Sequence, residues 1–410
     1  MIHRAHSLFW RYYGGLITGV EGAIVDFDRQ DPYPHYAHAR AADGLRFVPG
    51  LGAWLIARHA DARTVLRDPE TFSSANAMRP EVIPGPEAMA VLRSVPEGGP
   101  VVVTADGDDH RRVRDPLSRG LSPKRVAAAV PFVTGRAEEL VASFKADRRV
   151  ELMGRYARVL PGEVIGHLLG IGPADVPALI EGSYRAEDLI FREMDTDEQV
   201  AAAEDVAGMK RVLDAVVRGR GGEPGNDLCG EMIRGIEPHA TLLSNLQNLL
   251  LAGHMTTTAL IGTAVLHLLR DRGQWETICE RPELIPAAVE EAARYDAAVQ
   301  GFRRVATRPV TLAGTDLPEG AELFVAFGAA GRDPDAHERP GEFDVTRKPA
   351  RHLAFGHGVH ACPGAHLARE QLRITLETLT RELPGLRLEG PVEMLPNLIH
   401  RSPRELFLTW

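Results

Sequence analysis

The residues best suited to do chemistry in this sequence lie in a short glycine-rich segment near the C-terminal end. Residues 355–364 run Phe-Gly-His-Gly-Val-His-Ala-Cys-Pro-Gly and contain one cysteine, Cys362. An apolar pattern typical of a helix follows over residues 365–383, and Pro363 fits its first helical position. A cysteine just ahead of a helix N-terminus faces unpaired N–H groups, which favour a thiolate over a thiol. Cys362 is therefore a candidate metal ligand.

Three interpretations of Cys362 are open on these residues alone. The first is a small, buried, apolar side chain without a chemical role. The second is a zinc site that also uses His357, His360 and His366, although fitting three ligands from so short a segment around one tetrahedral ion is awkward. The third is haem iron held by a single axial thiolate.

The spacing of the residue types in this segment resembles the cysteine-ligand loop of the cytochromes P450. The matching positions are Phe355, Gly356, Gly358, His360, Cys362 and Gly364. The resemblance implies that the cofactor is haem b (iron protoporphyrin IX) and that Cys362 ligates its iron. It also implies that Phe355, Gly356, His360 and Gly364 contact the haem.

A second feature is the longest helical pattern of the chain, over residues 238–270. It is apolar on most faces, which predicts a buried helix, and its amides, His254 and threonines argue against a membrane span. Its middle contains Ala252, Gly253 and Thr256. A glycine followed by threonine hydroxyls can loosen a helix locally. This segment resembles the oxygen-binding kink of the P450 distal helix, which implies catalytic roles for these three residues.

The distal helix departs from the family pattern at one position. Met255 stands where these proteins usually carry an acid, and a methionine cannot relay a proton. A substrate carboxylate or hydroxyl, an ordered water or His254 could substitute for the acid. Two further interpretations stay open: Met255 simply packs while water delivers protons, or the enzyme catalyses a reaction with different proton needs.

Charged residues elsewhere match structural and cofactor-binding positions of the same family. Glu291 and Arg294, three apart on one helix face, resemble the buried Glu-x-x-Arg pair, with Arg347 as the expected third partner. Haem propionates need fixed cations. The residues that match these positions are His110, Arg114, Arg304, His352 and His360, with Arg303 as an alternative to Arg304. Pro116 is expected to shorten or bend the helix that carries Arg114.

The substrate pocket is expected to be apolar. Residues 73–104 form a long, proline-rich, irregular stretch, which is typical of a functional loop, with a disordered surface loop as the alternative. The candidate pocket residues are Met78, Val82, Met89, Leu249, Val299, Gln300, Phe302 and Leu398.

Patterning over the whole chain predicts a mainly α fold with small β-sheets, which the resemblance makes a P450 fold with a long central distal helix. Helices are expected over residues 36–43, 60–67, 126–144, 152–169, 174–192 and 198–218, and strands over 45–48, 53–56, 303–306, 310–312 and 322–326. No linker divides the 410 residues, so we expect an N-terminal lead-in over 1–30 and a single domain over 31–410.

Composition limits the cellular setting. The net charge of −9 argues against a general nucleic-acid binder, and three widely separated cysteines suit a reducing cytoplasm. Residues 8–25 are too polar to span a bilayer, so we expect no membrane association. A monomer is expected.

The resemblance implies a haem-thiolate monooxygenase that uses dioxygen to hydroxylate or epoxidise a medium-to-large hydrophobic secondary metabolite. Electrons would come from an acidic ferredoxin or flavodoxin docked on a basic patch, expected at Arg111, Lys124, Arg125, Arg351, Arg369 and Arg373. Two alternatives remain. One is an atypical enzyme that uses peroxide or couples radicals, which Met255 motivates. The other is a non-enzymatic haem protein that binds a gas.

Overall fold

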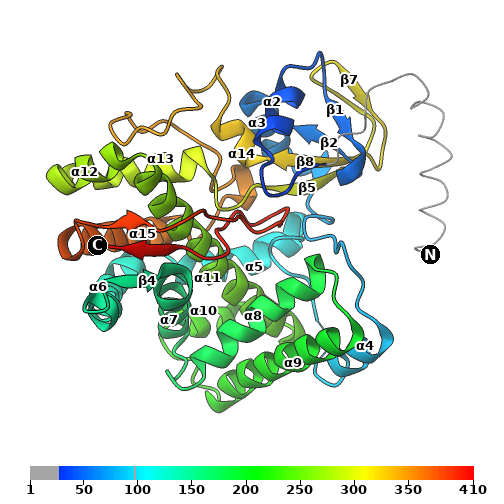
Figure 1. Ribbon diagram of the computed structural model, residues 1–410. Helices are drawn as coiled ribbons and strands as arrows, with labels where there is room; N and C mark the ends of the chain where they lie inside the picture. Colours follow the sequence, from blue (N-terminus) through cyan, green and yellow to red (C-terminus); the bar gives the residue numbers. More distant parts are fainter. Residues whose placement is uncertain (1–26, 97) are drawn as a thin grey trace.

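The longest helix, α11 (His239–Arg270), crosses the centre of the molecule and is buried along most of its length (Figure 1). The computed structural model describes residues 27–96 and 98–410, so most of the lead-in and the stretch 8–25 lie outside the described residues. Within the described residues, α11 is the one helix long and apolar enough to cross a membrane. Because 78% of its apolar window is buried inside the protein, it is a core helix.

Helices surround α11 on most sides and supply the main core. The longer ones are α5 (Gly107–Gly120), α6 (Pro123–Lys145), α7 (Val159–Leu169), α8 (Val176–Phe191), α9 (Thr196–Gly219), α12 (Arg272–Glu280), α13 (Ile285–Tyr295) and α15 (Ala365–Glu382). The shorter ones are α2 (Tyr33–Arg40), α3 (His59–Arg67), α4 (Pro86–Leu92), α10 (Leu228–Gly235) and α14 (Phe327–Gly331). Helix α11 packs on α7 and α8, while α15 packs on α6 and α13. The prediction of a mainly helical fold is confirmed.

Small sheets lie at the edge of the helical part. The largest has the order β1-β2-β8-β5-β3 and lies beside α2, α3 and α14 (Figure 1). Its strands are β1 (Arg46–Val48), β2 (Ala53–Ile56), β3 (Phe72–Ser73), β5 (Gly301–Ala306) and β8 (Glu322–Ala326). The other sheets join β4 (Arg149–Glu151), β10 (Phe407–Thr409) and β9 (Arg387–Leu388), and separately β6 (Val310–Leu312) and β7 (Thr315–Leu317).

Several predicted element boundaries were wrong, mostly at prolines. Helix α2 begins at Tyr33 rather than at residue 36, because its prolines occupy the first turn, where a missing N–H costs nothing. Helix α5 continues past Pro116 to Gly120, and the buried Pro116 ring packs where Gly235 leaves room for it. Met153–Ala157 form a π-helical turn ahead of α7, and the stretch 73–104 contains the short helix α4.

A buried charged cluster joins distant parts of the chain around Asp296, at the end of α13. Its fully buried carboxylate accepts hydrogen bonds from the hydroxyl of Tyr33 at 2.7 Å, Nε2 of His267 at 2.8 Å and Nε of Arg401 at 2.9 Å. Burial raises the pKa of Asp296, but the hydrogen bond from His267 and the charge of Arg401 hold it far below its usual range. The cluster therefore ties α2, α11 and the C-terminal segment to α13.

Replacing Asp296 with asparagine is expected to lower the free energy of unfolding by about 3–5 kcal/mol at pH 7, because Arg401 loses its buried counter-charge. The folded-state pKa lies below the ordinary 3.8, so the carboxylate stabilises the fold above that pH and the contribution is lost as the pH falls. Urea unfolding between about pH 5 and pH 3 should show a smaller pH dependence in Asp296→Asn than in the wild type. The exposed control Asp335→Asn should behave like the wild type; equal acid sensitivity of all three proteins would contradict the prediction.

Candidate active site

An internal cavity lies between α11 on one side and α15 with the Cys362 loop on the other. It encloses about 1430 Å³ of empty space, part of which opens to solvent. The α11 residues that line it are Asn248, Leu249, Ala252, Gly253, Thr256, Thr257 and Leu260. The loop and α15 contribute Phe355, Gly356, His360, Cys362, Gly364, Leu367 and Gln371 among others. The cavity thus brings together the two motifs that lie about a hundred residues apart in the sequence.

The loop can hold Cys362 at the cavity because two glycines adopt conformations that other residues avoid. Gly356 and Gly358 have φ values of +69° and +70°. A Cβ on Gly358 would lie 2.1 Å from the carbonyl oxygen of Leu66, so no larger residue fits there. The backbone N–H of Cys362 donates to the carbonyl of Phe355 at 2.8 Å, which closes the loop.

The protonation of Cys362 differs from the sequence-based prediction. Helix α15 begins at Ala365 after the cap residue Gly364, so Pro363 lies outside it and Cys362 is further from the helix end than expected. The sulfur is accessible from the cavity, yet it lies deep enough for burial to raise the pKa of the thiol. The N–H groups of Gly364 and Ala365 oppose this shift without reversing it. A bound metal ion would be needed to deprotonate the thiol outright.

Four cationic or basic side chains gather at one side of the cavity. Arg114, Arg304 and His360 line it, and the ring of His110 lies 4.2 Å from that of His360. The Nε2 atom of His110 is buried without a hydrogen-bond partner. Burial and the charges of Arg304, His110 and Arg114 lower the pKa of His360 to about 3, and burial lowers that of Arg304 to about 10.

These cationic and basic side chains have few hydrogen-bond partners within the protein. Arg304 donates to the carbonyl of Arg303 at 2.7 Å, Arg114 donates to the carbonyl of Ala361, and His360 bonds to the hydroxyl of Ser74 at 2.9 Å. The carboxylate of Asp106 approaches this cluster, with its Oδ1 atom 4.0 Å from Nε2 of His360. A cluster with unused donors and little counter-charge fits a ligand with carboxylate groups, as the two propionates of haem b are.

Two residues that were predicted to contact the haem propionates, His352 and Arg303, lie away from the cavity in the structure. His352 does not line the cavity; its Nε2 lies 3.2 Å from the carboxylate of Glu290, which also pairs with Arg369. This polar cluster draws the histidine away, so the expected propionate contact of His352 is corrected. Arg303 points to the other face of β5 and pairs with Glu322 at 3.3 Å, as alternation along a strand requires, whereas Arg304 faces the cavity.

The predicted substrate residues divide into two groups. Leu249, Val299 and Phe302 line the cavity. The residues that do not are Met78, Val82, Met89, Gln300 and Leu398.

The residues away from the cavity pack elsewhere. The loop that carries Val82 bonds to the end of α8, and α4 packs on α9. The buried side chain of Gln300 donates to the carbonyl of Ala297, and Leu398 belongs to the apolar cluster around Tyr36 and Phe324.

Sequence reasoning missed other cavity residues. From the loop 73–104, the residues that reach the cavity are Val102 and Val103, at its C-terminal end. Asn248 and Thr257 also line the cavity without having been proposed. The available signal for Asn248 was its spacing of four from Ala252 and eight from Thr256, which places all three near one helix face.

Glu291 and Arg294 form a doubly hydrogen-bonded ion pair whose side chains are 2% exposed. Nε and Nη2 of Arg294 each lie 2.7 Å from a carboxylate oxygen of Glu291. Arg347 approaches the same carboxylate at 3.1 Å. Arg294 also donates to the carbonyls of Gly331, Pro340 and Glu342. The three side chains thus clamp residues 331–347 to α13, which packs on α15 beneath the cavity.

Helix α11 is continuous through the threonine segment. The Thr256 hydroxyl donates to the carbonyl of Ala252 at 2.8 Å, and that of Thr257 to Gly253 at 3.4 Å. Met255 is buried and does not line the cavity.

His254 lies away from the cavity as well. It is buried, its Nδ1 bonds to the carbonyl of Leu250, and burial lowers its pKa to about 4. The interpretation of His254 as a substitute for the missing acid therefore has no support from its position.

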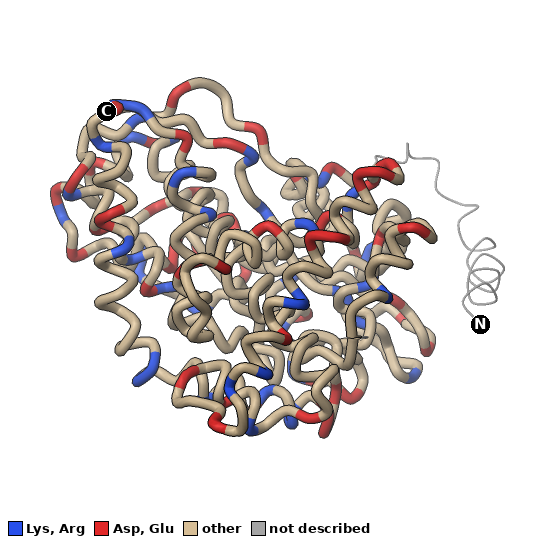
Figure 2. The backbone as a smooth tube through the Cα atoms, turned by 90° about the horizontal axis from the view of Figure 1, so that it is seen from below, with Lys and Arg blue, Asp and Glu red and all other residues tan. Residues whose placement is uncertain are grey.

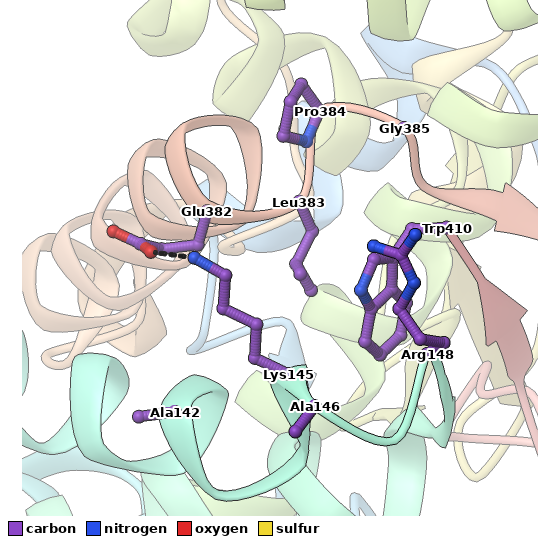
Figure 3. A pocket seen from close by; sticks show the side chains of 9 residues that line it. All are labelled: Ala142, Lys145, Ala146, Arg148, Glu382, Leu383, Pro384, Gly385 and Trp410. Carbon is purple, nitrogen blue, oxygen red and sulfur yellow. Dashed lines mark hydrogen bonds and ion pairs between the residues drawn. The ribbon is translucent and has the colours of Figure 1, made fainter.

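Other parts of the described chain offer no competing metal site. No group of three or more His, Cys, Asp or Glu side chains in residues 27–96 and 98–410 is placed to hold an ion, so the zinc arrangement is not formed. A separate surface hollow lies between the ends of α6 and α15 and the C-terminal Trp410 (Figure 3). The ion pair of Lys145 and Glu382, at 2.9 Å, spans part of it. It contains none of the predicted site residues.

Comparison with known proteins agrees with this architecture. Residues 272–384 match the cytochrome P450 family. The chain is 32% identical over 386 residues to cytochrome P450 107B1 of Saccharopolyspora erythraea, covering 91% of this chain and 93% of that protein. It is 33% identical over 404 residues to the monooxygenase PikC of Streptomyces venezuelae, covering 95% and 93%. The structure of cytochrome P450 CREJ with (4-ethylphenyl) dihydrogen phosphate matches with a TM-score of 0.88 at 30% identity, covering 94% and 98%.

The matched family and relatives are oxidoreductases that use haem b, and the cavity between the central helix and the cysteine loop fits this class of protein. With relatives of this identity over nearly its whole length, the chain belongs to the cytochrome P450 family.

Proposed function

We propose that the chain is a monooxygenase that holds haem b in the cavity between α11 and α15 and hydroxylates or epoxidises a medium-to-large hydrophobic metabolite. Residues 31–410 would form its single catalytic domain. The observation that carries the proposal is one cavity lined by a cysteine, by cations with unused donors and by the threonine face of α11. When bound, the haem supplies the activation of dioxygen.

The cofactor roles follow from the positions in the cavity. Cys362 would ligate the iron, and Phe355, Gly356 and Gly364 would contact the haem around it. Arg114, Arg304, His360 and His110 would take the propionates. Arg114 and Arg304 each use one guanidinium nitrogen on a backbone carbonyl and keep their other donors free, and Nε2 of His110 has no partner.

Thr256 is the residue of α11 best placed to handle a proton in the cavity. Its hydroxyl now donates to the carbonyl of Ala252, and it can exchange this bond for one to a water or a substrate oxygen. A Cβ on Gly253 would lie 3.0 Å from the side chain of Ile165, so glycine lets α7 pack closely on α11 beside the cavity. No lining residue of the described chain is Asp or Glu, so protons would arrive through water or a substrate group.

The lack of an Asp or Glu side chain among the described residues that line the cavity also supports a second candidate function. An atypical P450 that uses peroxide or couples radicals has a smaller need for relayed protons, and the burial of Met255 away from the cavity is consistent with it. Product formed with dioxygen and a reductase system, but not with peroxide, would exclude this candidate.

The substrate class rests on the cavity wall and on relatives. Away from the cationic cluster the wall is mainly apolar, with Leu249, Val299 and Phe302 among its members. Relatives named erythromycin C-12 hydroxylase and nocardicin C N-oxygenase act, by their names, on erythromycin and on nocardicin C. A secondary metabolite of comparable size is the corresponding proposal for this chain.

A ferredoxin or flavodoxin is proposed as the electron donor, although the basic patch expected for it is largely neutralised. Arg111 pairs with Asp108, Arg125 with Glu231, and Arg373 with Glu370 and Glu377. Arg369 is likewise paired with Glu290. Figure 2 shows both signs of charge interspersed along the chain. Docking of the electron donor would then depend on the shape complementarity of the two surfaces and on the charges of Lys124 and Arg351. It would depend less on a strong positive electrostatic potential. A cytoplasmic monomer remains part of the proposal.

The absorption spectrum of the reduced, carbon-monoxide-bound protein tests the proposed function. A strongly red-shifted Soret band is expected, because a thiolate donates electron density to the iron. A band at the ordinary position would mean that a histidine ligates the iron. A colourless protein would remove the haem from the proposal altogether.

A further inference from the structure

The first turns of α11 carry polar side chains that are already occupied by the protein. The hydroxyl of Ser244 accepts the N–H of Gly99 at 2.9 Å, and Oδ1 of Asn245 accepts the N–H of Val102 at 2.9 Å. Asn245 also donates to the carbonyl of Pro100 at 2.8 Å. The segment 99–102 thus covers this part of the helix.

Asn248 is the next polar side chain along the same face, one turn further on, and it lies beyond this cover. It is partly buried and lines the cavity, as do Val102 and Val103 from the end of the covering segment. Within the described residues no hydrogen bond or ion pair is formed by its side chain, whose amide has two donors and one acceptor group. The amide is therefore available to a molecule in the cavity.

The other polar side chains of α11 that line the cavity are committed to the helix. Thr256 and Thr257 donate to carbonyls four residues back. Within the described residues, Asn248 is thus the α11 side chain that brings an unused hydrogen-bond donor to the cavity. It lies eight residues before Thr256, about 12 Å along the helix axis.

We propose that Asn248 is a specificity-determining residue that hydrogen-bonds a neutral oxygen-bearing group of the substrate, such as a ketone, ester, amide or hydroxyl. This inference rests on the proposed function. The bound group would lie about 12 Å along α11 from Thr256. A fully apolar molecule would bury the amide without a partner, which reduces its affinity. A carboxylate would be buried beside a neutral amide rather than a cation, which is also unfavourable. The favoured substrate is therefore an apolar molecule with a neutral polar group remote from the oxidised carbon.

Matched rigid probes test this inference: 5α-androstane, 5α-androstan-3-one and 5α-androstan-17-one. Each is titrated into the haem-loaded protein, and Kd is measured from the change in the Soret region or, where no change occurs, by equilibrium dialysis. At least one ketone is expected to bind roughly three- to tenfold more tightly than the hydrocarbon, the range of one neutral hydrogen bond. Asn248→Leu, which keeps the side-chain size, should remove that difference. Gln247→Leu, on the same helix but outside the cavity lining, should retain it.

The ratio of ketone to hydrocarbon affinity would not move if Asn248 merely supported the fold. No ketone advantage in the wild type, including no binding of any probe, overturns the inference, as does an advantage that persists in Asn248→Leu. Failure of the proposed function is distinguishable, because it would appear as a missing red-shifted band while dialysis still reports the ketone preference.

Discussion

Replacing Cys362 with serine is expected to abolish the red-shifted Soret band of the reduced carbon monoxide complex and to lower oxidation activity on the order of a thousandfold or more. Serine has nearly the same size and leaves the loop intact, but its hydroxyl does not form an anion at neutral pH and is a poor ligand for haem iron. The loop hydrogen bond from the N–H of residue 362 to Phe355 uses backbone atoms, so it survives the substitution. The change therefore isolates the sulfur.

The two other cysteines provide controls for this substitution. Cys229 is buried and burial raises the pKa of its thiol to about 11, while Cys279 is partly buried. Neither lines the cavity, so Cys279→Ser should keep the wild-type spectrum. A red-shifted band that survives in Cys362→Ser would show that another side chain supplies the axial ligand. An ordinary band in that variant would point to a histidine such as His360 taking the iron.

Replacing Glu291 with alanine is expected to lower the free energy of unfolding by about 3–5 kcal/mol, because Arg294 and Arg347 then share a buried site without their counter-charge. The Glu291 and Arg294 side chains are each 2% exposed, so bulk water does not solvate the arginine that is left behind. The N–H of Asp344, which donates to Glu291 at 2.9 Å, also loses its acceptor. We further expect reduced haem retention, because the clamped segment 331–347 leads into the cysteine loop.

Urea unfolding at pH 7, followed by circular dichroism and by Soret absorbance, measures both effects of Glu291→Ala. The control is Glu283→Ala, an exposed carboxylate just before α13, whose effect should stay within about 0.5 kcal/mol. A Glu291→Ala protein as stable as this control would show that the ion pair contributes little beyond its own desolvation cost. If Glu291→Ala keeps full stability but loses haem, the ion pair of Glu291 with Arg294 and Arg347 would serve only to position the cysteine loop.

The sequence by itself determined the features that depend on local spacing. The glycine pattern of residues 355–364, the apolar periodicity of residues 238–270 and the separation of Glu291 from Arg294 are set by the covalent chain, and the structure places each in the expected kind of element. A spacing of three on a helix brings two side chains together whatever else the chain does. Boundaries failed at prolines, as at Tyr33 and Pro116, because proline is compatible with a first turn and, where packing compensates, with a helix interior.

The tertiary structure alone decided which side chains face the cavity. His352 turns to Glu290, a partner on a helix sixty residues earlier that its local sequence does not reveal. Gln300 and Leu398 pack into the fold, whereas Asn248 opens to the cavity because the segment 99–102 stops covering α11 one turn before it. Burial likewise raises the pKa of Cys362 against the helix end that was expected to lower it. Side-chain direction and desolvation are properties of contacts between distant elements, and for that reason local patterns could not supply them.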